Sequence, residues 1–169
     1  MGFFIRESVF NTEVIHSLRA QGAWAHKLTD TPASLARAMR FVPEKPCDII
    51  AFIGGRGVGI EGKQQKKYEA FGIRHLRDAQ VRELDAMVEE GKGEAFIFLN
   101  IRIASPRTNR LVIFNWKLWR EKLKSGVSLK KKEIESLPFL TGKSGIFDLS
   151  DFCRSVVERV DAYGPENHY

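Results

Sequence analysis

The sequence predicts one domain of the α/β (α+β) class that spans residues 1–169. The chain has 43% hydrophobic and 28% charged residues, which at this length suffices for one core of ordinary size. Stretches with apolar side chains at helical spacing alternate with short runs rich in β-branched and aromatic residues. A glycine-rich turn joins two of these runs into a hairpin. The predicted order is a helix, three strands, a helix and two strands, followed by a basic tail region.

The first helix is predicted over residues 3–21. Its apolar side chains recur at helical spacing, and they are Phe3, Phe10, Val14 and Leu18. Gly22 supplies a stop, and "AWAHKL" then predicts a strand. Residues 29–46 carry prolines near both ends and are long for a loop in a compact domain, so we expect an irregular or protruding element. The alternative is a helix that packs on the sheet through Leu35, Met39 and Phe41.

The second and third strands are "DIIAFI" and "GVGIEGK", joined by a turn at residues 54–57. Residues 73–90 predict the second helix, closed by two glycines shortly after its end. "EAFIFLNIRI" and "RLVIFNW" predict two further strands around an "SPRTN" turn.

The charge of the chain favours a polyanionic partner such as nucleic acid. The formal net charge is +6 and the pI is near 9.4. Residues 117–132 hold seven basic residues and one acidic residue, a surplus of six that equals the net charge of the whole chain. Trp116 and Trp119 interleave with this segment, although a tryptophan pair beside a strand end more often belongs to a core or an interface than to a base-stacking platform.

Cysteine usage and the start of the sequence indicate a soluble protein of the cytoplasm. Cys47 and Cys153 are the only cysteines, and no paired Cys/His spacing supports a zinc site or a disulfide framework. The opening "MGFFIRESVF" interrupts its apolar residues with Arg6 and Glu7, which leaves too short a run for a secretion signal or a membrane span. We therefore expect no membrane association.

The predicted hairpin carries charged residues whose positions indicate a metal site. Because side chains alternate faces along a strand, Glu61 and Lys63 share one face while Val58 and Ile60 share the other. A tight hairpin brings Asp48 back beside Glu61. Two carboxylates so close need a cation between them, and oxygen ligands favour Mg²⁺ or Mn²⁺. The alternative for such a short pattern is a surface salt bridge on an exposed hairpin.

Two polar residues on the apolar stripes of the predicted helices are expected to lie near the charged hairpin residues. Glu7 lies in the stripe of the first predicted helix, and Gln80 lies in that of the second. A polar group on a core-facing stripe costs free energy unless it has a partner. We expect both to face the hairpin, whereas Glu13 lies off the stripe and should be solvated.

Asp48 followed by Glu61-Gly62-Lys63 resembles the D-(x)n-(D/E)-x-K core of the PD-(D/E)XK nucleases, with a glutamate on an upstream helix. The blocks "AHKLTDTP", "HLRDAQVREL", "GEAFIFLNI" and "KSGVSLKKKEIESLPFL" resemble successive blocks of RecU-type Holliday-junction resolvases, and archaeal-type resolvases share the core spacing. The resemblance covers most of residues 7–150. It implies a restriction-endonuclease-like fold with a mixed central sheet flanked by helices.

The resemblance implies roles for the hairpin and helix residues. Asp48 and Glu61 would hold Mg²⁺, for which Mn²⁺ can substitute, with the Ile60 carbonyl as a further ligand. Lys63 would position the attacking water or the phosphate. Glu7 matches the helix carboxylate, and Gln80 matches a glutamine near the scissile phosphate.

The expected activity is metal-dependent hydrolysis of phosphodiesters in four-way DNA junctions by a homodimer. The residues expected to contact DNA are Lys27, Arg37, Arg40, Lys130, Lys131 and Lys132. The protruding element at residues 29–46 is expected to select the junction. Two alternatives are another PD-(D/E)XK nuclease of restriction or end-processing type, and a non-catalytic DNA-binding module of the same fold.

Overall fold

The computed structural model describes residues 7–30, 32, 37, 39, 45–104 and 107–161. The helices are α1 (Glu7–Ala20), α3 (Asp78–Glu89), α4 (Trp116–Lys124), α5 (Lys131–Ser136) and α6 (Ser150–Asp161), with one 3-10 turn, η1 (Ile73–His75). The strands are β1 (Trp24–Lys27), β2 (Ile49–Ile53), β3 (Arg56–Gln65), β4 (Glu94–Ile103), β5 (Thr108–Asn115) and β6 (Leu140–Thr141).

The strands form one sheet of mixed direction in the order β1-β2-β3-β4-β5-β6. β3 and β4 run parallel, and the other neighbouring pairs are antiparallel. The parallel pair needs a crossover, which α3 provides. This architecture confirms the expected fold class, an α/β domain with a mixed central sheet flanked by helices.

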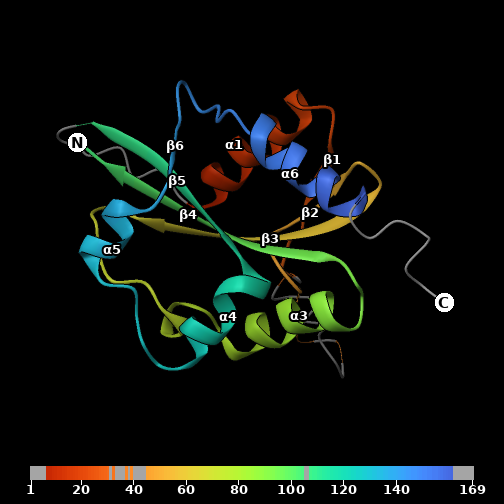
Figure 1. Ribbon diagram of the computed structural model, residues 1–169, viewed down its shortest axis with the longest axis horizontal. Coiled ribbons are helices and arrows are strands. Elements are labelled where there is room, and N and C mark those ends of the chain that lie inside the picture. The colour runs from red at the N-terminus through yellow and green to blue at the C-terminus, as the bar shows by residue number, and fades with distance from the viewer. Residues whose placement is uncertain are drawn as a thin grey trace.

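Helices cover the sheet on both faces (Figure 1). The domain therefore has two apolar layers, one on each side of the sheet. On one face, α1 and α6 pack through residues such as Phe10, Val14 and Phe152. On the other face, α3, α4 and α5 contribute Leu84, Leu123 and Ile134 among others. β4 is buried on both sides, with Phe96 and Phe98 in the first layer and Ile97 and Leu99 in the second. This explains why its sequence is a nearly continuous apolar run.

The hairpin forms as predicted but with a tighter turn. Gly54 and Gly55 have φ angles of 57° and 81°, which a two-residue turn of this kind requires at both central positions. β3 therefore begins at Arg56, inside the predicted turn. The ladder ends where Ile49 pairs with Ile60, and the next residues beyond this pair are Asp48 and Glu61.

The second helix is shorter than predicted, and the tail region holds more structure. Residues 73–75 form the separate turn η1, and α3 begins only at Asp78, because the backbone is extended at Leu76 and Arg77. The prediction of a helix from residue 73 was wrong. The tail region contributes three helices and an edge strand, of which α6 completes one apolar layer.

Much of the expected junction-contacting element lies outside the described residues, including Leu35, Arg40 and Phe41. Arg37 and Met39 are described, and both are exposed. In the described part of the chain, no helix has the length and apolarity needed to cross a membrane.

Candidate metal centre

Asp48 lies next to Glu61 because it directly precedes β2 and its backbone still bonds β3, one residue out of the ladder register. The Asp48 amide donates to the Ile60 carbonyl at 3.1 Å, and the Gly62 amide donates back to Asp48 Oδ2 at 3.0 Å. The backbone of β3 thus fixes the Asp48 carboxylate, which is only 5% exposed. The predicted convergence of the two acids is confirmed.

Glu61 is a fully buried carboxylate with an unusual proton affinity. Burial raises the pKa of Glu61 to about 7, and Asp48 and Glu7 add to the rise while Lys63 opposes it. Its Oε1 accepts hydrogen bonds from Lys63 Nζ at 2.7 Å and from Gln80 Nε2. Its Oε2 is buried and has no partner among the described residues.

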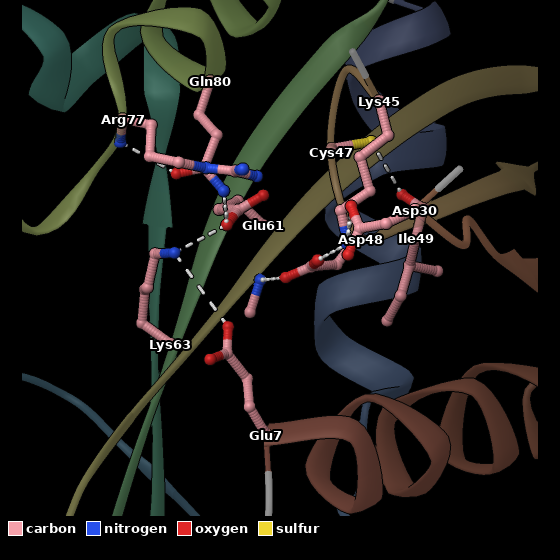
Figure 2. A network of polar contacts seen from close by, with 11 residues as sticks. Glu7, Asp30, Lys45, Cys47, Asp48, Ile49, Glu61, Lys63, Arg77 and Gln80 are labelled. Atoms are coloured by element: carbon pink, nitrogen blue, oxygen red, sulfur yellow. Dashed lines mark hydrogen bonds and ion pairs between the residues drawn. The ribbon is translucent and has the colours of Figure 1, made fainter. Parts of the chain in front are cut away.

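Glu7 completes a group of three carboxylates (Figure 2). It lies in the first turn of α1, and one of its carboxylate oxygens lies within 4.8 Å of oxygens from both Asp48 and Glu61. Its side chain is 48% exposed and lies 3.9 Å from Lys63 Nζ. Burial is the largest cause that raises its pKa, against the lowering effect of Lys63.

The expectation that Glu13 is solvated was wrong. Its side chain is 15% exposed and forms an ion pair with Arg102 at the far end of β4. α1 lies across the sheet, so its side chains meet strand residues that the helical stripe alone does not reveal. Of the two acids, Glu7 lies at the carboxylate group and Glu13 belongs to a separate ion pair.

Two lysines balance the acids from opposite sides. Lys63 bonds Glu61, and Lys45 Nζ donates to Asp48 Oδ1 at 2.7 Å. Burial alone lowers the pKa of Lys45, but the hydrogen bond and charge of Asp48 outweigh it, so its pKa is raised. Sequence reasoning missed Lys45 as a site residue, although its position three residues before Asp48 was a usable signal.

The start of α3 explains the place of Gln80. Gln80 Oε1 accepts from the Arg77 amide at 2.9 Å and so caps the helix, while its amide nitrogen donates to Glu61. One side chain thus satisfies a free backbone donor and a buried carboxylate. The expectation that Gln80 faces the hairpin is confirmed. Figure 2 shows the Arg77 side chain beside Gln80 and Glu61, a neighbour that sequence reasoning missed.

An open cleft of about 640 Å³ surrounds these groups. Besides the carboxylates, it is lined by Lys27 at the end of β1 and by Arg74 and Arg77 before α3. Lys27, expected to contact DNA, therefore lies at the site. Lys130, Lys131 and Lys132 are exposed around the start of α5 and do not line this cleft.

The Ile60 carbonyl is a poor candidate ligand, because it accepts a hydrogen bond from the Asp48 amide and Ile60 does not line the cleft. Backbone groups two residues apart on a strand point to the same edge. The Gly62 amide already reaches Asp48 on that edge, past the end of β2. The geometry therefore directs the Gly62 carbonyl, rather than that of Ile60, toward the carboxylates.

The residues at the site fit a hard divalent cation. Three carboxylates converge, two of them buried, and the donor set is made of oxygen. A buried carboxylate oxygen without a partner, such as Glu61 Oε2, is costly unless it binds a cation or a donor. These features match Mg²⁺ or Mn²⁺ better than a soft metal.

The tryptophan pair belongs to the core rather than to a stacking platform. Trp116 is fully buried and donates from Nε1 to Asp85 at 2.8 Å. Trp119 packs edge-on against Phe114 with ring centroids 5.1 Å apart. The core alternative is confirmed for Trp116, and Trp119 is half-buried against the same core.

No protein-family model matches this sequence, and no curated protein sequence matches it. Among solved structures, the chain is similar to Hjc, a Holliday junction resolvase from the archaeal hyperthermophile Archaeoglobus fulgidus. The TM-score is 0.41 and the identity 21%, over 64% of this chain and 75% of that chain. A likeness at this level does not establish a shared function, so a function must be argued from the site.

Proposed function

We propose that this protein is a Mg²⁺-dependent endonuclease that hydrolyses phosphodiesters in four-way DNA junctions, and that it acts as a homodimer in the cytoplasm. The observation that carries the proposal is the convergence of Glu7, Asp48 and Glu61, with Lys63 bonded to Glu61, in a cleft bordered by cations. Burial raises the pKa of Glu61 and of Glu7, and carboxylates perturbed in this way in a cleft are typical of functional sites.

Each side chain has a role in this proposal. Glu7, Asp48 and Glu61, with the Gly62 carbonyl, would hold the cation, which when bound lowers the pKa of water and offsets charge on the phosphate. Lys63 would orient the attacking water or a phosphate oxygen. Gln80 bonds Glu61 and lines the cleft, where it would border the scissile phosphate.

The basic side chains around the cleft suit the DNA backbone. Lys27, Arg74 and Arg77 lie on the cleft walls and would bind phosphates, which positions DNA without reading its sequence. Lys130, Lys131 and Lys132 are exposed and would extend the contact to a duplex arm. A homodimer supplies two such sites, as symmetric cleavage of two strands requires.

The test is incubation of the protein with end-labelled four-way junction, matched duplex and single strand, in Mg²⁺ or in EDTA. Symmetric nicks in the junction alone, in Mg²⁺ alone, are the expected result. Asp48→Asn should abolish cleavage while junction binding in Ca²⁺ persists. Cleavage of all three DNAs would favour another nuclease of this superfamily, and binding without cleavage would favour a non-catalytic module.

Junction selection is proposed to reside in residues 29–46. Arg37 is exposed, and Arg40 lies outside the described residues. Replacing both with alanine should reduce junction affinity more than duplex affinity at matched ionic strength, because general phosphate contacts serve both DNAs alike. Equal losses would move the selectivity elsewhere, for example to the spacing of two active sites in a dimer.

A further inference from the structure

Asn11 is a buried polar residue in the wall of the cleft. It is only 3% exposed, and its Oδ1 has no hydrogen-bond partner among the described residues. A buried acceptor without a partner destabilises a fold. An asparagine in the apolar stripe between Phe10 and Val14 therefore needs an explanation beyond packing.

The position of Asn11 ties it to the carboxylate group. It lies one helical turn after Glu7 on the same face of α1, so the two side chains are neighbours. Its Oδ1 lies so close to Gly62 that a Cβ at position 62 would overlap it. Gly62 in turn holds Asp48 through its amide. Asn11 thus contacts the backbone that fixes one proposed ligand and is adjacent to another.

The unpartnered atoms of the structure concentrate at this site. In the described part of the chain, three buried side-chain polar atoms have no partner: Asn11 Oδ1, Glu61 Oε2 and Arg102 Nε. The first two are oxygen acceptors on residues that line the cleft. The third belongs to a guanidinium whose other nitrogens bind Glu13 and Asn109. Two orphaned acceptors at one cleft indicate a ligand that donates or carries positive charge.

From this we infer that Asn11 is a positioning residue of the metal centre, whose side-chain carbonyl accepts a hydrogen bond from water in the shell of the bound cation. The inference rests on the proposed function. Mg²⁺ usually keeps several of its waters when it binds protein, and those waters are strong donors. Acceptors just outside the ligands orient such a shell, and their loss typically weakens metal binding about 10- to 100-fold.

The test measures Mn²⁺ binding by titration calorimetry, alongside urea unfolding in EDTA. Asn11→Leu removes the acceptor at similar volume, and it should weaken Mn²⁺ binding about 10- to 100-fold while stability in EDTA stays at or above the parental value. The matched control is Thr12→Leu, which introduces the same side chain at the next, exposed position of α1 and should leave affinity unchanged. Asn11→Asp keeps the shape and an acceptor, and should bind Mn²⁺ at least as tightly as the parent.

Each other outcome is decisive. If Asn11→Leu binds Mn²⁺ like the parent, or Asn11→Asp weakens binding, the inference is overturned while the metal centre stands. If Asn11→Leu loses stability in EDTA, the amide has a structural role instead. If the parental protein shows no Mn²⁺ binding that Asp48→Asn removes, the metal centre itself fails and the inference falls with it.

Discussion

Replacing Glu61 with glutamine should stabilise the metal-free protein at neutral and alkaline pH. Glu61 is fully buried, and burial raises its pKa from 4.5 to about 7. Below pH 4.5 the carboxyl is protonated in both the folded and the unfolded chain, so it has no effect on stability. As the pH rises toward 7, the unfolded chain gives up this proton and the folded chain retains it, so stability falls. Above pH 7 the loss is complete and constant.

The magnitude follows from the two pKa values. One pKa unit corresponds to about 1.4 kcal/mol, so ionised Glu61 costs the fold about 3 kcal/mol at pH 8. Glutamine removes this cost but also takes the charged partner from Lys63, whose side chain is 19% exposed. We therefore expect a net gain of about 2 kcal/mol, a large share of the roughly 5–15 kcal/mol that stabilises a domain.

The assay is urea unfolding in EDTA from pH 4.5 to 8.5, for the parent, Glu61→Gln and the control Glu90→Gln, which changes an exposed acid after α3. The difference between parent and Glu61→Gln should widen with pH up to about 7 and then level off, while the control shows no such curve. Adding Mg²⁺ at pH 8 should stabilise the parent more than the variant. A pH-independent difference, or a Glu61→Gln variant less stable at pH 8, would refute the reasoning.

Three further predictions concern the surroundings of the carboxylates. Gly62→Ala should lower stability by about 1–3 kcal/mol in urea unfolding, because the new Cβ overlaps the Asn11 amide, and a neutral effect would contradict that contact. Lys45→Met should tighten Mn²⁺ binding several-fold in calorimetry and lower stability in EDTA, because the Lys45 ammonium competes with the ion for Asp48 Oδ1. Weaker Mn²⁺ binding would show instead that Lys45 supports the site. Glu7→Gln should abolish cleavage in single-turnover kinetics while Glu13→Gln leaves it within about threefold, and the opposite ranking would remove the helix carboxylate from the site.

The hairpin and its carboxylates were predictable because their geometry is local. Strand alternation puts Glu61 and Lys63 on one face, and two glycines with positive φ close the turn that brings Asp48 back. A change of one residue in the register of β3 would move Glu61 to the other face of the sheet. The apolar residues that β3 buries on that other face determine the register, and they therefore determine the position of the site as well as the fold.

The parts that sequence reasoning missed depend on contacts between distant segments. Lys45 and Arg77 lie 32 positions apart in the chain and line the same cleft only because β2, β3 and the start of α3 come together there. The apolar spacing that begins at Ile73 predicts a helix from that residue. The Gln80 side chain instead accepts a hydrogen bond from the Arg77 amide and caps the helix there, so α3 begins later than the spacing predicts. Helical periodicity predicts which side chains share one face of a helix, but it does not predict which strand residues that face contacts. The ion pair between Glu13 and Arg102 was therefore not predictable from the sequence.

Charge counted along the chain also differs from charge that a ligand can reach. In the basic segment 117–132, Arg120 and Lys124 pair with Asp85 of α3, and Lys122 pairs with Glu133 of α5. Part of the surplus that makes the segment conspicuous in the sequence therefore holds helices together. The cleft draws its cations from other segments: Lys27 ends β1, Lys45 and Lys63 bond the carboxylates, and Arg74 and Arg77 precede α3. Because these side chains come from separate segments, the packing of the segments, rather than the local composition of any one of them, determines where this fold presents positive charge to a polyanion.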